Sequence, residues 1–108
     1  MAEGLNLAGG QKSSVTEYRS NKGVWPSSNA EAGIPEPTDI TGKYVAQVTV
    51  TTSASAGLIK ATMRTSGVAA RISGESLILK GTETNGAYVW SCESSVPDRF
   101  LPSSCRDS

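Results

Sequence analysis

The sequence contains no histidine, and aromatic residues make up only 6% of it. Because histidine is absent, Ser-His-Asp and Cys-His catalysis and any imidazole metal site are excluded. Basic and acidic residues number 10 each, and no Lys/Arg cluster supplies the basic footprint that nucleic-acid binding normally requires. No apolar run approaches the length of a membrane span, and no stretch has the charged and apolar regions of a signal peptide.

The remaining candidates for catalysis are isolated from one another. Glu75, Glu83 and Glu93 are separated by expected turns, so nothing brings two carboxylates to one site. The many serines have no general base to activate them. The sequence therefore predicts neither an enzyme nor a cofactor- or metal-binding protein, and it shows no specific nucleic-acid site.

The chain has two cysteines, Cys92 and Cys105, close together near its C-terminus. A zinc site needs more soft ligands than this, and a redox pair normally has the spacing Cys-x-x-Cys. We therefore expect a disulfide, which indicates an oxidising compartment. Closing a loop of this size contributes about 3 kcal/mol in the chain-entropy model, which matters for a small domain with few large apolar residues.

The first part of the chain has the pattern of an amphipathic helix over residues 3–22. Apolar positions recur at helical spacing, and two glycines, Gly9 and Gly10, interrupt them. The helix is expected to end at Gly23 and to pack one face on a sheet. That face consists of Leu5, Ala8, Val15 and Tyr18.

Residues 23–42 are rich in proline and glycine, which predicts an extended, ordered loop with Trp25 and Ile34 as its anchors. Four strands are expected after it, at about 43–52, 58–65, 76–81 and 87–92, and Asn85-Gly86 is a strong hairpin signal. In the first strand, alternation places Tyr44, Ala46, Val48 and Val50 on one face; in the second, it places Ile59, Ala61 and Met63 inward. The expected fold is α+β: a single domain over 1–108, with an N-terminal helix packed on a four-stranded antiparallel sheet and a C-terminal disulfide loop over 92–105.

The segment between the cysteines is stiff, because it holds Pro97 and Pro102 as well as the expected disulfide. Phe100 and Leu101 are expected to fold inward and, with Trp25 and Trp90, to be the structural anchors. The polar rim would then present its backbone and side chains to a partner at low entropic cost. The polar and turn residues of this rim are Ser94, Ser95, Pro97, Asp98, Arg99 and Ser103.

Several segments together resemble the type IV pilins of bacteria. The C-terminal signature of that family is similar to Tyr88-Val89-Trp90-Ser91-Cys92, followed by Phe100-Leu101-Pro102 and Cys105. The loop and first strand of the major pilins of the a subclass resemble Gly23-Val24-Trp25-Pro26, Ala32-Gly33-Ile34 and Ile40-Thr41-Gly42-Lys43-Tyr44-Val45. The similarity covers essentially the whole chain in the right order.

This resemblance implies a pilin fold and a structural function. Such a subunit is held in the inner membrane, undergoes processing that includes methylation, and assembles with other pilin subunits into a helical extracellular fibre, the pilus or fimbrium. The implied roles are adhesion, twitching motility, DNA uptake or phage attachment. In some relatives the disulfide loop contacts host glycans, so residues 93–104 are expected to face a receptor, either a host-cell glycan or a phage.

The family's leader peptide and strongly apolar N-terminal helix have no counterpart in the sequence. We therefore expect a soluble head domain that lacks this hydrophobic half-helix, with Met1 as an artificial start, so that membrane contact would be made only through the missing helix. One alternative is a minor pilin or a pseudopilin, although Cys92 and Cys105 count against the latter. Another is a small secreted binding module, which would explain the stiff loop but not the truncated helix.

Overall fold

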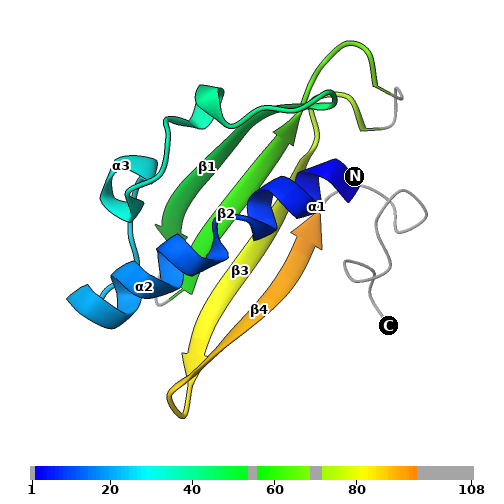
Figure 1. The fold of residues 1–108 in the computed structure, drawn as a ribbon. Coiled ribbons are helices and arrows are strands. Elements are labelled where there is room, and N and C mark those ends of the chain that lie inside the picture. Colours follow the sequence, from blue (N-terminus) through cyan, green and yellow to red (C-terminus); the bar gives the residue numbers. More distant parts are fainter. Residues whose placement is uncertain (1, 54–55, 69–71, 95–108) are drawn as a thin grey trace.

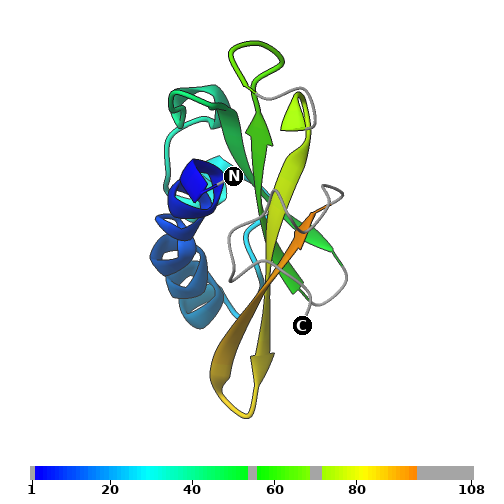
Figure 2. The same cartoon turned by 90° about the vertical axis from the view of Figure 1, so that its right-hand side faces the viewer.

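The computed structural model describes residues 2–53, 56–68 and 72–94. Helices cover one face of a four-stranded sheet, as the two perpendicular views show (Figures 1 and 2). The elements in chain order are α1 (Ala2–Gly9), α2 (Lys12–Lys22), α3 (Asn29–Ala32), the 3₁₀ helix η1 (Pro37–Asp39), β1 (Val45–Ser53), β2 (Ala56–Met63), β3 (Ser76–Thr84) and β4 (Ala87–Ser94). The predicted packing of an N-terminal helical segment on a four-stranded antiparallel sheet is confirmed.

The sheet is a meander with the strand order β1-β2-β3-β4, and each strand runs antiparallel to the next. The predicted hairpin is present: Thr84 pairs with Ala87, and Asn85 and Gly86 both have positive φ, 52° and 82°. Positive φ at both central residues is the type I′ geometry that suits the twist of the flanking strands. The first two strands were predicted at about 43–52 and 58–65. In the structure β1 and β2 extend closer to each other along the chain, since their last pair is Ser53 with Ala56.

The single helix predicted over 3–22 is wrong, because the structure has two helices, α1 and α2. The break follows the two glycines, whose low helix propensity weakens the helix at that point. The amide of Gln11 bonds the Ala8 carbonyl at 3.0 Å, and the Gln11 side chain donates to the Leu7 carbonyl. Gly23 ends α2 in the left-handed conformation, as predicted. None of the helices described is long and apolar enough to cross a membrane.

The beginning of β1 also differs from the predicted alternation. The β1–β2 register shifts between Val45 and Gln47, which marks a β-bulge. As a result Val45 is fully buried, whereas Tyr44, expected on the same face as Val48, is 38% exposed. Beyond the bulge the alternation holds, and Val48 and Val50 are buried.

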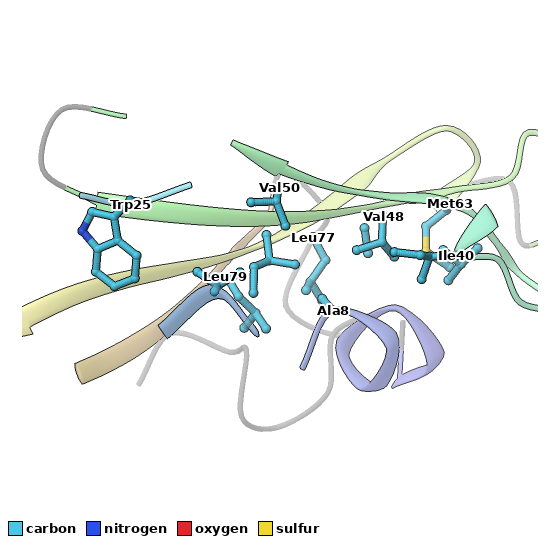
Figure 3. Close-up of a cluster of buried hydrophobic side chains, with 12 residues drawn as sticks. Ala8, Trp25, Ile40, Val48, Val50, Met63, Leu77 and Leu79 are labelled. Atoms are coloured by element: carbon cyan, nitrogen blue, oxygen red, sulfur yellow. The ribbon is translucent and has the colours of Figure 1, made fainter. Parts of the chain in front are cut away.

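The core lies between the sheet and the helices (Figure 3). Ile59, Ala61 and Met63 of β2 face it, as predicted. A Cβ built on Gly4 of α1 would lie 3.4 Å from the sulfur of Met63, so α1 lies against the sheet. The other buried apolar residues of this cluster are Ala8, Val15, Trp25, Ile40, Val45, Val48, Val50, Leu77 and Leu79.

Candidate functional site

The predicted receptor-facing stretch, residues 93–104, begins inside β4, which ends at Ser94. Ser94 is the last residue of β4; it pairs with Leu77, and its hydroxyl donates to the Ser76 carbonyl at 2.7 Å. Ser94 therefore belongs to the sheet rather than to the loop. The other predicted loop and anchor residues lie outside the described part of the chain: Ser95, Pro97, Asp98, Arg99, Phe100, Leu101 and Ser103.

Cys92 lies on β4 opposite Leu79 and packs, partly buried, against the core. Its side chain is therefore on the helix-covered side of the sheet. Cys105 lies outside the described residues, so the disulfide between the two cysteines stays a prediction.

Trp25 and Trp90 meet in an aromatic cluster that joins the loop after α2 to the last strand. The ring of Trp25 makes edge-to-face contacts with Tyr88 at 5.8 Å and with Trp90 at 6.1 Å between centroids. Each tryptophan lies against a glycine, Trp25 against Gly57 of β2 and Trp90 against Gly81 of β3, and a Cβ at either glycine would collide with the indole. The two glycines pair with each other across β2 and β3, so together they form the floor of the cluster.

Two cations of α2 lie over these rings. The Arg19 guanidinium is 5.9 Å from the ring centre of Trp25, and the Lys12 ammonium is 5.9 Å from the ring centre of Trp90. Arg19 also forms an ion pair, because its Nη2 is 2.8 Å from Oε1 of Glu83 on β3. These side chains connect α2 to the β3–β4 hairpin. The ion pair is partly exposed, so its own contribution to stability is small.

The carboxylate of Glu3 joins the start of α1 to the start of β1, a contact that the sequence did not reveal. Its Oε1 accepts from the amides of Tyr44 at 2.7 Å and Val45 at 3.1 Å, and its Oε2 accepts from the Lys43 amide at 3.1 Å. The hydrogen bond from the Tyr44 amide is the main cause that lowers the pKa of Glu3, with smaller contributions from the other two amides, while desolvation opposes it. Successive amides that converge on one anion form a backbone nest.

Asn29 holds the loop 23–42 against the outer edge of β1. Its Nδ2 donates to the carbonyls of Val48 and Pro35 at 2.9 Å, and its Oδ1 accepts from the Val50 amide at 2.6 Å. The buried carboxamide thus takes the place of a neighbouring strand's peptide group. A sequence signal for the local geometry was present, because Ser28 and Glu31 have capping-box spacing, and the Ser28 hydroxyl caps α3 by accepting from the Glu31 amide.

These contacts fix a scaffold rather than a reactive centre. Glu3 and Asn29 each make three hydrogen bonds, all of them to backbone groups of β1 or of the segments before it. Among residues 2–53, 56–68 and 72–94, no three His, Cys, Asp or Glu side chains gather as a metal site requires. The class defined by this geometry is a structural α+β head, with a helical layer on one face of the sheet and a loop pinned along the β1 edge.

Comparison with known proteins identifies the family. The family model for pilin, the protein of bacterial filaments, matches residues 1–106. The fimbrial protein EcpC of Eikenella corrodens is 49% identical over 108 residues, which cover the whole of this chain and 69% of that protein. A type IV major pilin protein, PilE1, of Neisseria gonorrhoeae is 38% identical over 128 residues, covering all of this chain and 69% of that protein. A fimbrial protein of Neisseria meningitidis serogroup A is 37% identical, covering all of this chain and 75% of that protein.

The chain therefore belongs to the pilin family, among the type IV pilins. It is a structural, non-enzymatic subunit of a pilus or fimbria that assembles with other pilin subunits and has its place at the pilus surface.

Proposed function

We propose that the chain is a major pilin whose fibre serves adhesion, and that residues 93–104 form its receptor-facing surface. The observation that supports this proposal is the difference between the two edges of the sheet. At the β1 edge, the polar side chains bind other groups of the same chain: Asn29 bonds β1, and Glu31 accepts from the amide and hydroxyl of Ser27. At the β4 edge, the chain continues into a stretch rich in polar residues.

The chemistry of this stretch suits a hydroxyl-rich ligand. Asp98 contributes acceptors, Arg99 contributes a fork of donors, and Ser95 and Ser103 contribute hydroxyls that both donate and accept. Pro97 and the proposed disulfide would restrict the backbone, which lowers the entropic cost of binding. Host-cell glycans are hydroxyl-rich ligands of this kind, and they are the first partner that we propose. The second is a phage that binds the same surface.

The fibre would have further roles that do not depend on this loop. We propose twitching motility and DNA uptake as such roles. We also propose that the subunit is located in the inner membrane before it is assembled. A minor pilin would have the same head but would not form a fibre by itself. The major-pilin proposal is therefore tested by whether cells that express this pilin as the sole major candidate still assemble pili.

The receptor surface is tested in assembled pili by replacing the two charged residues that follow β4 in this stretch, Asp98→Ala with Arg99→Ala. We expect weaker binding of pili to host cells and to a glycan array, with unchanged piliation. The matched control, Asp39→Ala with Lys43→Ala, removes one acidic and one basic side chain, both exposed, from the segment before β1. Equal binding by the loop variant and the wild type, followed by equal binding when Ser95 and Ser103 are also replaced, would show that the loop is only a structural clasp.

A further inference from the structure

Beyond Gly81 the β3–β4 hairpin is only two strands wide. The pairing of β2 with β3 extends as far as Gly57 with Gly81, so residues 82–84 of β3 pair with β4 alone. The turn projects past the ends of β1 and β2 (Figures 1 and 2), and residues 83–87 are exposed. Because an isolated two-stranded hairpin is only marginally stable, this tip can open locally while the rest of the sheet stays folded.

The turn consists of Asn85 and Gly86, whose polar groups are left without partners. Among residues 2–53, 56–68 and 72–94, the Asn85 carboxamide takes part in no hydrogen bond, and the Gly86 amide donates to no backbone carbonyl. No heavy atom of these residues lies within 4 Å of a Cβ built on Gly86, so the amide nitrogen is not shielded from that side. An exposed carboxamide followed by an unbonded, unshielded amide has the two groups that condense to a cyclic imide.

We propose that the Asn85-Gly86 pair is a site of spontaneous deamidation, which converts the exposed carboxamide into a carboxylate at the tip of the hairpin. The Gly86 nitrogen loses its proton to hydroxide and attacks Cγ of Asn85. A bond between this nitrogen and Cγ forms, the bond between Cγ and Nδ2 breaks, and ammonia leaves with a proton taken back from water.

Water then opens the imide in one of two ways. Cleavage of the bond between the Gly86 nitrogen and Cγ gives aspartate, whereas cleavage of the bond between that nitrogen and the backbone carbonyl carbon gives isoaspartate. The net change in both cases is the loss of one ammonia and the gain of one water. This chemistry does not depend on receptor binding by the stretch after β4.

The other asparagines of the chain are protected by their surroundings. Asn29 is buried, and its carboxamide is held by three hydrogen bonds. Asn6 and Asn21 lie in α1 and α2, where the amide of the next residue donates to a carbonyl of the preceding turn. They are followed by Leu7 and Lys22, whose side chains shield that amide, so the hairpin tip is the place where the reaction is expected first.

The two products change the hairpin differently. Both carry a carboxyl group that is ionised at pH 7, so the tip gains negative charge close in sequence to Glu83, the partner of Arg19. Aspartate tolerates the positive φ of Asn85 and keeps the turn. Isoaspartate adds a backbone carbon to the connection, so the pairing of Thr84 with Ala87 is lost, because loop length fixes the register of a hairpin. The acidic fraction of the protein therefore increases with the age of the subunit.

The first test follows each asparagine separately in the folded wild-type chain. The protein is incubated in H₂¹⁸O and then digested with trypsin in ordinary water, so that only conversion during the incubation leaves heavy oxygen in the new carboxylate. The four asparagines fall in different tryptic peptides, because lysine or arginine lies between each of them and the next. We expect label at Asn85 at least tenfold faster than at the other three, and faster at pH 8 than at pH 7, because the deprotonated amide is the nucleophile. A rate at Asn85 no higher than that at Asn21, or a rate that does not change with pH, would overturn the proposal.

The second test separates the geometry of the turn from its dipeptide sequence. Asn85→Gly leaves a Gly-Gly pair that suits the same turn, so it should remove the label from this peptide and keep the urea midpoint near that of the wild type. Ala30→Gly, at an exposed position, creates another Asn-Gly pair at the protected Asn29. In the folded variant Asn29 should react at least tenfold more slowly than Asn85, whereas in guanidinium chloride the two should react at similar rates. Equal rates in the folded variant, or label in the same peptide of Asn85→Gly, would contradict the assignment.

Discussion

Glu3 and Tyr44 are joined by a 2.7 Å hydrogen bond from the Tyr44 amide to the Glu3 carboxylate, although they lie at the starts of different layers of the fold. The same carboxylate accepts from the next amide, and Arg64 of the segment after β2 donates twice to the neighbouring Gly42 carbonyl. The first turn of α1 is thereby held to the entry of the sheet.

Glu3→Gln should lower the free energy of unfolding by about 0.5–1 kcal/mol at pH 7, because charge-assisted hydrogen bonds are stronger than neutral ones but solvent screens an exposed carboxylate. The pKa of Glu3 is lowered in the folded state, so its stabilisation is complete above the ordinary glutamate pKa of about 4.3 and is lost as the pH falls through the lower folded-state value. Urea unfolding of the wild type and the variant should therefore converge at strongly acidic pH. Glu17→Gln, on the exposed face of α2, is the control; a difference between wild type and Glu3→Gln that does not change with pH would contradict the assigned role.

Gly42 gives an independent test of the same contact. A Cβ at this position would collide with the Glu3 carboxylate. Gly42→Ala should therefore displace the carboxylate and destabilise the protein, but it should have little further effect in a Glu3→Ala background. A double-mutant cycle measured by urea unfolding would show this coupling, and additive losses would mean that Gly42 matters for another reason.

Asn29→Ala should be more costly, by about 2–4 kcal/mol, because it leaves the Val50 amide and the Val48 carbonyl without their partner in a buried place. Exposing an edge strand also favours pairing with another chain, so we expect the variant to aggregate more readily on warming. The midpoint of urea unfolding and light scattering measure the two effects. Asn21→Ala, at an exposed position of α2, should change stability by less than about 0.5 kcal/mol; a loss equally small for Asn29→Ala would show that other contacts hold the loop.

The parts of the fold that could be predicted from the sequence are those with a local cause. Alternating side chains predicted the strands, and the Asn85-Gly86 pair predicted the hairpin because few other residues adopt positive φ at both positions. The inward side chains of β2, including Ile59 and Met63, followed from the same alternation.

The parts that could not be predicted depend on contacts between distant residues. The bulge near Val45 shifts the pairing register of β1 against β2, and the alternation of side chains along β1 carries no information about that shift. Glu3 bonds amides 40 to 42 positions away, and Asn29 bonds strand residues 19 and 21 positions away. At the sequence level both residues look like ordinary polar side chains, so only the tertiary arrangement reveals what they do.

The predicted disulfide between Cys92 and Cys105 has a direct test. The intact mass should increase by two hydrogens on reduction. Replacing both cysteines by serine should lower the free energy of unfolding by about 3 kcal/mol, the loop-closure value for a segment of this length. A Ser91→Ala, Ser104→Ala protein keeps both thiols and is the matched control. An unchanged mass on reduction would mean that the cysteines are not paired with each other.

The two glycines below the aromatic cluster should tolerate no side chain. A Cβ at Gly81 would lie 2.8 Å from Cη2 and Cζ3 of Trp90, and one at Gly57 would collide with Trp25. We expect Gly57→Ala and Gly81→Ala each to cost about 1–3 kcal/mol, as overpacked cores do, and to shift the tryptophan emission to longer wavelength. Gly10→Ala adds the same methyl group at ordinary distances, 3.5 Å from the Leu7 carbonyl oxygen, and should be neutral or slightly stabilising. Because the chain has only two tryptophans, the emission reports on this cluster alone. If both strand variants kept wild-type emission and unfolding midpoints, the indoles would have room to move, and the cluster would not fix the loop after α2 against the sheet.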